Sequence, residues 1–167
     1  MGIGIPVTKV IHPSSVEALD LQSEVPFTRL RVFRSTGKWL FEENQDLLHM
    51  FEKFRQYRTK EEQINSTELA EHANNVMNTL DEGIKGLDDL DNFFAYIHQV
   101  GASHRRIPGF KVEYFWKIEA PFLAAVETTL GDRYTPNVEN IYKITIKFIL
   151  ETLIEGYEKA GTPGNST

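Results

Sequence analysis

Apolar residues recur at intervals of three and four along most of the chain, the spacing that one face of an α-helix presents. The segment that starts at Pro26 carries the stripe Leu30, Phe33, Gly37, Leu40 and Phe41. No alternating runs are joined by Asn-Gly or Asp-Gly, and no internal repeat is visible. The pattern therefore predicts an all-α protein of about seven helices and no sheet. The expected segments are 16–25, 26–44, 45–57 (a short turn or helix), 65–84, 88–106, 111–130 and 135–156.

Capping and breaking residues mark where these helices should begin and end. Residues 65–68 form an Asn-x-x-Glu start close to a capping box, and the Thr-Pro pair at 135–136 has the order of an N-cap and a first helical residue. Three acids open the segment 88–106 and two arginines close it, which complements the helix dipole at both ends. Pro121 lies inside 111–130, so we expect a kink or a break there.

Composition and charge narrow the function. A chain of 167 residues, with 41% hydrophobic and 25% charged residues, suits one globular domain with its own core. The net charge of −6 argues against nucleic-acid binding, because no basic field would attract the phosphates. The absence of cysteine excludes disulfides, a thiolate nucleophile and iron–sulfur sites. It is also compatible with a reducing cytosol, and we expect a cytoplasmic protein.

No segment is expected to span or anchor in a membrane. No apolar run approaches the roughly 20 residues that a bilayer-spanning helix needs. The opening "MGIGIPVTK" is too short and too weakly cationic for a signal peptide. Pro6 stands where the myristoylation pattern requires Ser or Thr.

Two of the five histidines are expected to point inward. His104 continues an apolar stripe that begins 14 residues earlier, at Leu90, so it must face the core or a cavity. His72 lies beside a second apolar stripe. The other three carry weaker signals: His12 has no periodic context, His49 is expected at the surface, and His98 sits in mid-helix. The stripes are Leu90, Phe93, Ile97 and Val100 for His104, and Leu69, Ala73, Val76 and Leu80 for His72.

Inward histidines have an ordinary structural interpretation beside the functional one. Most such histidines are hydrogen-bonded core or boundary residues, and ligation is the exception. Zinc needs three or four ligands, and no HExxH, His-x-His or cysteine supplies them. A pair on two helices raises the odds of a shared ligand only modestly, so the spacing alone leaves both interpretations open.

The residues around both histidines resemble those of the globin family. Phe51 and Phe54 follow "FEENQDLLHM". His72 comes 21 residues after Phe51, within "EHANNV", and His104 comes 32 residues later, within "SHRRI". With Tyr142 in the last helix, the resemblance implies the globin fold, seven to eight helices around a haem pocket. The implied organisation is an N-terminal extension at 1–12, a globin domain at 13–160 and a disordered tail at 161–167.

The resemblance implies a cofactor and a set of site residues. It makes haem b (iron protoporphyrin IX) the cofactor, His104 the proximal ligand of the iron and His72 the distal histidine. The apolar porphyrin needs aromatic and branched walls with a few polar groups at its edge. The implied walls are Phe51, Phe54, Val76, Phe110 and Phe115, and the candidate cations for the haem propionates are Arg55, Arg58, Arg105 and Arg106.

The chain departs from the globin pattern at two positions. Gln45 replaces the usual proline of the corner, which weakens a turn signal and leaves the spacing intact. In an ungapped register Gly37 stands where a large residue normally covers the iron, while a slipped register would place Phe33 or Leu40 there. Because no tyrosine occurs in 27–47, we expect His72 to be the one obvious hydrogen-bond donor over the iron.

Three functions are compatible with such a site. In the first, His72 binds the iron directly, and a bis-histidyl six-coordinate centre serves electron transfer or redox or oxygen sensing with an unidentified redox partner. In the second, His72 donates a hydrogen bond to O₂, CO or NO at an open sixth site that stores, transports or senses gas. In the third, the domain binds no haem and takes part in signalling or protein interactions. This alternative is the weakest, because both ligand positions hold histidine.

The segment "SHRRI" and the space expected at Gly37 favour the first function. Within the family, the chain most resembles neuroglobin and invertebrate, in particular nematode, neuronal globins. We do not expect an enzyme, although peroxidase, nitrite-reductase or NO-scavenging turnover can accompany any accessible haem. Sustained NO dioxygenation needs a reductase, and the chain has no GxGxxG and no flavin or dinucleotide domain.

Overall fold

The computed structural model describes residues 26–50, 56–57, 59, 61–62, 65–85 and 89–162. These residues are helical, with no β-strand among them, as the periodicity predicts. The expected extension at 1–12, the helix at 16–25 and tail residues 163–167 lie outside the described part. The α-helices are α2 (Pro26–Glu43), α4 (Thr67–Lys85), α5 (Leu90–Ser103), α6 (Glu119–Leu130) and α7 (Pro136–Ala160), and the 3₁₀ helices are η2 (Gln45–Met50), η5 (His104–Arg106), η6 (Val112–Ile118) and η7 (Gly131–Arg133).

Two of the helix starts follow from local capping chemistry. The Thr135 hydroxyl accepts a hydrogen bond from the Val138 amide at 3.3 Å, and Pro136 occupies the first helical position of α7. The Asp89 carboxylate accepts from the Asn92 amide at 3.2 Å at the start of α5. In both helices, a side chain satisfies an amide that the first turn cannot pair. The predicted N-cap of α7 is confirmed.

The predicted capping box at the start of α4 is wrong. The Ser66 carbonyl accepts the first helical hydrogen bond, from Ala70 at 3.2 Å, so the N-cap lies one residue later than expected. The Asn65 side chain instead donates to the Glu61 carbonyl at 2.9 Å. The Glu68 carboxylate accepts from the Tyr57 hydroxyl at 2.6 Å. Glu68 therefore accepts a hydrogen bond from another segment, whereas in a capping box its carboxylate would accept one from the N-cap amide.

The segment 111–130 breaks at the place that its proline indicates. Residues Val112–Ile118 form the 3₁₀ helix η6, and α6 begins at Glu119, two residues before Pro121. A proline in the first helical turn costs little, because its missing N–H would have had no partner there. The last helix is longer than predicted and runs to Ala160, beyond the expected end at Gly156.

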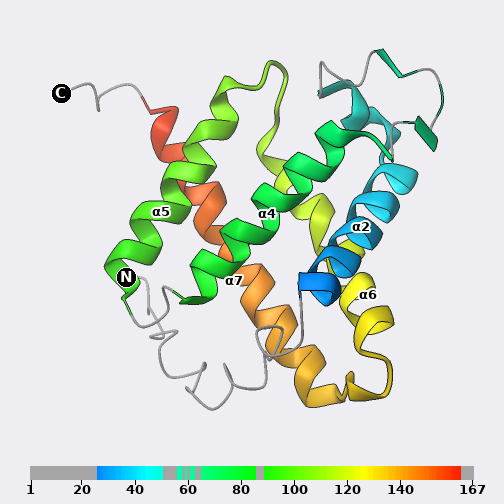
Figure 1. The fold of residues 1–167 in the computed structure, drawn as a ribbon. Coiled ribbons are helices and arrows are strands. Elements are labelled where there is room, and N and C mark those ends of the chain that lie inside the picture. Colours follow the sequence, from blue (N-terminus) through cyan, green and yellow to red (C-terminus); the bar gives the residue numbers. More distant parts are fainter. Residues whose placement is uncertain are drawn as a thin grey trace.

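Figure 1 shows α4 crossing in front of α7, with α5 on one side and α2 and α6 on the other. The most extensive helix contact among the described residues joins α5 to α7. A Cβ atom added to Gly101 would overlap the Leu153 backbone, and one added to Gly156 would overlap the His98 backbone. Gly156 therefore serves the helix crossing and does not end α7. Side chains from α2, α5, α6 and α7 form the core: Val32, Phe93, Ile97, Phe122, Val126, Tyr142, Ile146, Ile149 and Leu150.

Among the described residues, no helix combines the length and the apolar character that crossing a bilayer requires.

Candidate functional site

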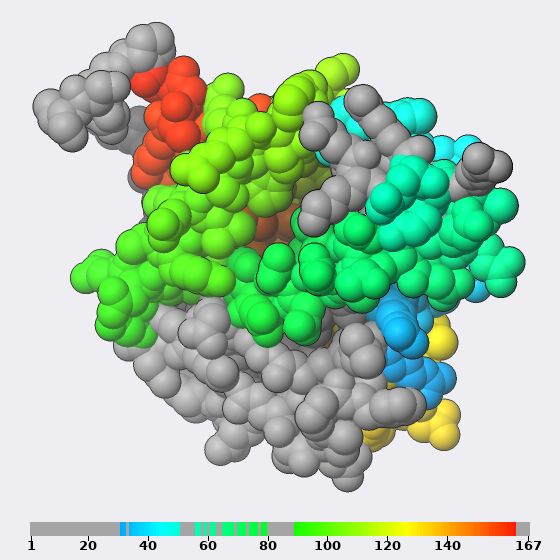
Figure 2. All heavy atoms as spheres, turned by 45° about the horizontal axis from the view of Figure 1, so that its top comes forward, coloured from blue at the N-terminus to red at the C-terminus, as the bar shows by residue number. Residues whose placement is uncertain are grey.

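A cavity of ≈ 640 Å³ lies between the helices and is lined mainly by apolar side chains. Its size falls in the range of pockets that hold cofactors and drug-sized ligands. Figure 2 shows the surface hollowed between the atoms of α5 and those of α4, with atoms of α7 visible at the bottom of the hollow. Five of the predicted site residues line the cavity, whereas Phe51 and Phe54 lie outside the described residues. The five are His72, Val76, His104, Phe110 and Phe115.

His104 stands where α5 passes into η5, and its ring is held from several sides. The distance from its Nδ1 to the Val100 carbonyl oxygen is 2.8 Å. A carbonyl oxygen only accepts, so Nδ1 carries the proton and the lone pair of Nε2 is left unprotonated. The ring centroid lies 5.0 Å from that of Phe110 and 4.8 Å from that of Phe115. The tautomer and the packing together suit this imidazole to binding a metal, since ligating histidines typically donate their other ring N–H.

His72 lies on α4 and is half-buried. Burial, with a smaller contribution from the charge of His104, lowers the pKa of His72 from 6.5 to about 4. Both rings line the cavity. Burial also lowers the pKa of His104, against the smaller opposing effect of its hydrogen bond to Val100. Both imidazoles are therefore neutral near pH 7, the form that binds iron.

His98 and His49 do not belong to the cavity lining. The Nε2 atom of His98 lies 3.1 Å from a carboxylate oxygen of Glu155, so this histidine joins α5 to α7 at the outside of the crossing. His49 is exposed on η2, as its sequence context indicates. His12 lies outside the described residues. Of the histidines that the structure describes, only His72 and His104 line the cavity.

The α2 wall of the cavity contains the departure at Gly37. Gly37 is buried and lines the cavity, and Leu40 lines it as well, so residues of both the ungapped and the slipped register belong to this wall. The neighbouring Thr36 also lines the cavity, and its hydroxyl donates to the Val32 carbonyl at 2.7 Å. That internal bond uses the hydroxyl hydrogen of Thr36 within α2. Asn75 and Thr79 of α4 also line the cavity, so the expected role of His72 as the donor over the iron stays a prediction.

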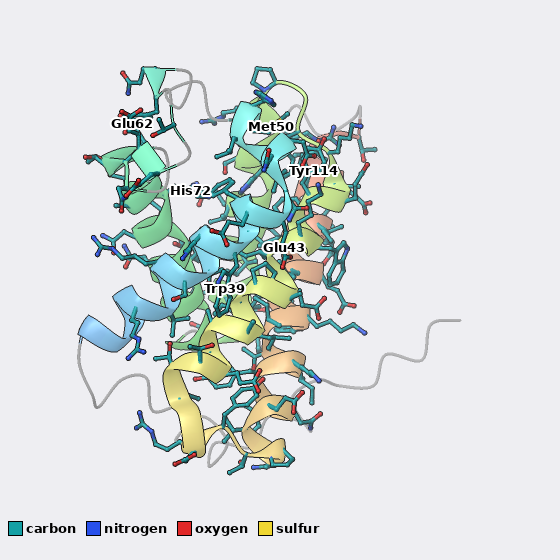
Figure 3. All side chains as sticks on the ribbon, turned by 90° about the vertical axis from the view of Figure 1, so that its right-hand side faces the viewer. Trp39, Glu43, Met50, Glu62, His72 and Tyr114 are labelled. Carbon is teal, nitrogen blue, oxygen red and sulfur yellow. The ribbon has the colours of Figure 1, made fainter. Side chains whose placement is uncertain are left out.

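Some lining residues were not expected from the sequence. Tyr114 lines the cavity because η6 is a 3₁₀ helix, whose three residues per turn place side chains differently from the α-helix predicted for 111–130. Met50 lies just before the expected corner and also lines the cavity. Figure 3 shows Met50, Tyr114 and His72 in the same half of the molecule, whereas Trp39 and Glu43 lie lower. Of Met50 and Tyr114, only Met50 could have been expected in the cavity lining from the sequence, because it precedes Phe51.

Arg105, one of the candidate cations for the haem propionates, is bound to α7 in the described structure. Its Nε donates to the Tyr157 carbonyl at 2.9 Å, and its guanidinium carbon lies 4.1 Å from the centroid of the Tyr157 ring. The side chain therefore lies on α7, and it is not among the residues that line the cavity. Arg106 is exposed, while Arg55 and Arg58 lie outside the described residues. The sequence places Arg105 beside His104 but does not show that α7 binds it.

Two neutral histidines on a mainly apolar cavity could serve as ligands of a haem iron. The globin family model matches residues 38–153. The chain belongs to the globin family. It is 25% identical to the neuroglobins of Tetraodon nigroviridis and Danio rerio over 122 residues, which cover 73% of this chain and 76% of each relative.

A solved structure extends the comparison. This globin superposes on a hexacoordinated haem protein from an anhydrobiotic tardigrade, determined at pH 4, with a TM-score of 0.73 and 32% sequence identity. The match covers 87% of this chain and 91% of the tardigrade chain. This globin is therefore a haem-binding protein of the neuroglobin-like kind, and its family binds diatomic gases. Haem supplies an iron atom whose two axial positions accept imidazole or a diatomic molecule.

Without haem, this globin should lose stability as the pH falls from 6.5 to about 4. In that window the unfolded chain protonates His72 whereas the folded protein does not, so stability rises with pH and is complete above about 6.5. The shift corresponds to about 3 kcal/mol, and the lowered pKa of His104 acts in the same direction. Urea unfolding of the haem-free protein at pH 7 and pH 5 measures the effect. His72→Gln should lose less stability on acidification, and an equal loss in both proteins would show that burial of His72 is not the cause.

Proposed function

We propose that His104 and His72 bind the haem iron from opposite faces, and that this six-coordinate centre serves electron transfer or redox or oxygen sensing. The observation that carries the proposal is the pair of neutral imidazoles lining one mainly apolar cavity. Each ring comes from a different helix, so a flat ligand can lie between them. The partner is an unidentified electron donor or acceptor.

We assign the two histidines different roles at the iron. His104 has a fixed tautomer and two aromatic neighbours, so it is suited to remain on the iron. The buried Gly37 lines the same cavity as His72 and contributes no side chain to it. We propose that His72 is the ligand that leaves and returns. We further propose that Val76, Phe110 and Phe115 form walls of the haem site.

Phe51 and Phe54 complete the proposed walls by their place in the sequence. We propose that the globin domain runs from 13 to 160 and that the protein is cytoplasmic. The chain has no cysteine, which suits a reducing compartment.

The relatives support six-coordination. The tardigrade protein, 32% identical, is described as hexacoordinated, and the curated relatives with which this chain aligns over 122 residues include neuroglobins. Two imidazoles that stay in place in both oxidation states keep the surroundings of the iron similar, and a small reorganisation favours electron transfer. A histidine that must leave before a gas can bind makes the same site responsive to oxygen.

Gas binding at an open sixth site is the alternative function. The space beside Gly37 favours it, because a diatomic molecule could lie there and accept a hydrogen bond from His72. In that case the protein stores, transports or senses gas. The two functions differ in one observable property, the coordination of the iron when no external ligand is added.

The absorption spectrum of the ferric protein without added ligand distinguishes the two functions. We expect low-spin six-coordinate bands near pH 7, because His72 is neutral and lines the same cavity as His104. The ferrous spectrum should likewise be six-coordinate. His72→Gln should convert the ferric bands to a high-spin form, while His49→Gln, at an exposed position, should leave them unchanged. A high-spin spectrum with bound water in the wild type would support the gas-binding function instead.

A further inference from the structure

The residue that follows the proposed proximal histidine is bound to the far end of α7. The Arg105 guanidinium donates from Nε to the Tyr157 carbonyl at 2.9 Å. Its carbon also lies 4.1 Å from the centroid of the Tyr157 ring, within cation–π range. Tyr157 belongs to the last turn of α7, where a positive charge interacts favourably with the helix dipole. Arg105 therefore ties the end of α5 to the end of α7.

Tyr157 holds the other end of the same segment. Its hydroxyl donates to the Phe110 carbonyl at 3.0 Å. Its ring centroid lies 5.7 Å from that of Phe110 and 5.8 Å from that of Phe115, the two rings that flank His104. One buried tyrosine thus binds both Arg105 and Phe110, the two ends of the turn that follows His104. Arg105 and Tyr157 do not line the cavity themselves, so they can act on His104 only through the residues that they bind.

The Arg105 guanidinium lies against Gly161, the residue that follows the end of α7. A Cβ atom added to Gly161 would overlap the Arg105 guanidinium, so the arginine lies where any larger residue at 161 would place its side chain. Gly161 has φ −92°, a conformation that alanine also adopts. A larger residue here would therefore displace the Arg105 guanidinium and would not strain the backbone.

We propose that Arg105, through the clamp that it forms with Tyr157, positions His104 and keeps it on the iron, so that ligand exchange takes place on the His72 side. The clamp acts through the backbone on both sides of the proximal turn and through the rings of Phe110 and Phe115. Both are positioning residues. The inference rests on the proposed role of His104 as an iron ligand.

The test uses nitric oxide and the ferrous haem-loaded protein. Nitric oxide weakens the iron bond on the opposite face, and the electron paramagnetic resonance spectrum of the product shows whether a histidine nitrogen is still bound there. The wild type should retain the histidine. Arg105→Lys keeps the charge but loses the Nε donor and the planar contact, and Tyr157→Phe loses only the hydroxyl. We expect each to shift the equilibrium toward the form without histidine by about tenfold, the effect of one such bond.

Gly161→Ala is the decisive variant, because it displaces the guanidinium without altering the clamp residues and without forcing an unfavourable backbone. It should increase the histidine-free form while the thermal midpoint of the haem-free protein stays near the wild-type value. Arg34→Lys makes the same change at an exposed position of α2, away from the cavity lining, and should leave the spectrum unchanged. If Arg105→Lys or Tyr157→Phe does not fold, Gly161→Ala alone decides the question.

Equal amounts of the histidine-free form in the wild type and in Gly161→Ala, with the histidine retained in both, would overturn the clamp while leaving the proposed function intact. A wild-type spectrum without bound histidine, unchanged by His104→Ala, would instead overturn the role of His104 itself. The two failures are therefore distinguishable in one series of spectra.

Discussion

His104→Ala should release haem much faster than the wild type and lower the thermal midpoint of the haem-loaded protein. In the proposed site His72 can leave the iron, so His104 is the protein ligand that retains the cofactor. Its Nδ1 bond to Val100 and its packing against Phe110 and Phe115 would have no substitute in the variant. Haem stabilises the fold by binding the native state only, a contribution of about 4 kcal/mol when its concentration is 1,000 times the dissociation constant. The transfer of haem to an excess of haem-free acceptor globin measures the loss rate.

His98→Ala is the matched control for this experiment. His98 lies on the same helix, but it pairs with Glu155 outside the cavity. Its replacement should leave the haem-loss rate within the error of the wild type. Normal haem content and an unchanged spectrum in His104→Ala would show that the proximal assignment is wrong. A faster haem loss in His98→Ala than in His104→Ala would point to a different ligand on α5.

His72→Leu should change the kinetics of carbon monoxide binding to the ferrous protein. In the wild type, carbon monoxide must wait until His72 leaves, so the observed rate should level off at high ligand concentration and the plateau should report the dissociation of the histidine. The leucine cannot bind iron. The plateau should therefore disappear, the rate at high concentration should rise by about tenfold or more, and the ferrous spectrum should become five-coordinate. Flash photolysis or rapid mixing over a wide range of carbon monoxide concentrations measures the rates.

His49→Leu is the control for a general effect of losing a histidine, because His49 is exposed and does not line the cavity. It should retain the wild-type plateau. A wild-type protein whose rate rises linearly throughout and whose ferrous iron is already five-coordinate would rule out the bis-histidyl centre. Gas storage, transport or sensing would then be the better account of the site.

The fold class followed from the sequence because helical periodicity and capping residues act locally. Thr135 and Pro136 determine the start of α7 through contacts within one turn, and Pro121 fits only the first turn of α6. The stripe that ends at His104 has the same origin, because residues at these intervals share one helix face whatever the helix packs against. The start of α4 was predicted less well, because the Glu68 carboxylate accepts a hydrogen bond from Tyr57, a residue from another segment.

Helical spacing was enough to predict most of the helices and to turn His72 and His104 inward, because residues at these intervals share one helix face. The surroundings of the two histidines depend on how distant helices pack. The proton position on His104 and the low pKa of His72 depend on burial and on groups brought together by packing. The partner of Arg105 is 52 residues away in the chain, and no local pattern could show that α7 binds it. The periodicity of a helix determines which of its sides is buried. The packing of distant helices determines which of several possible partners a polar side chain binds.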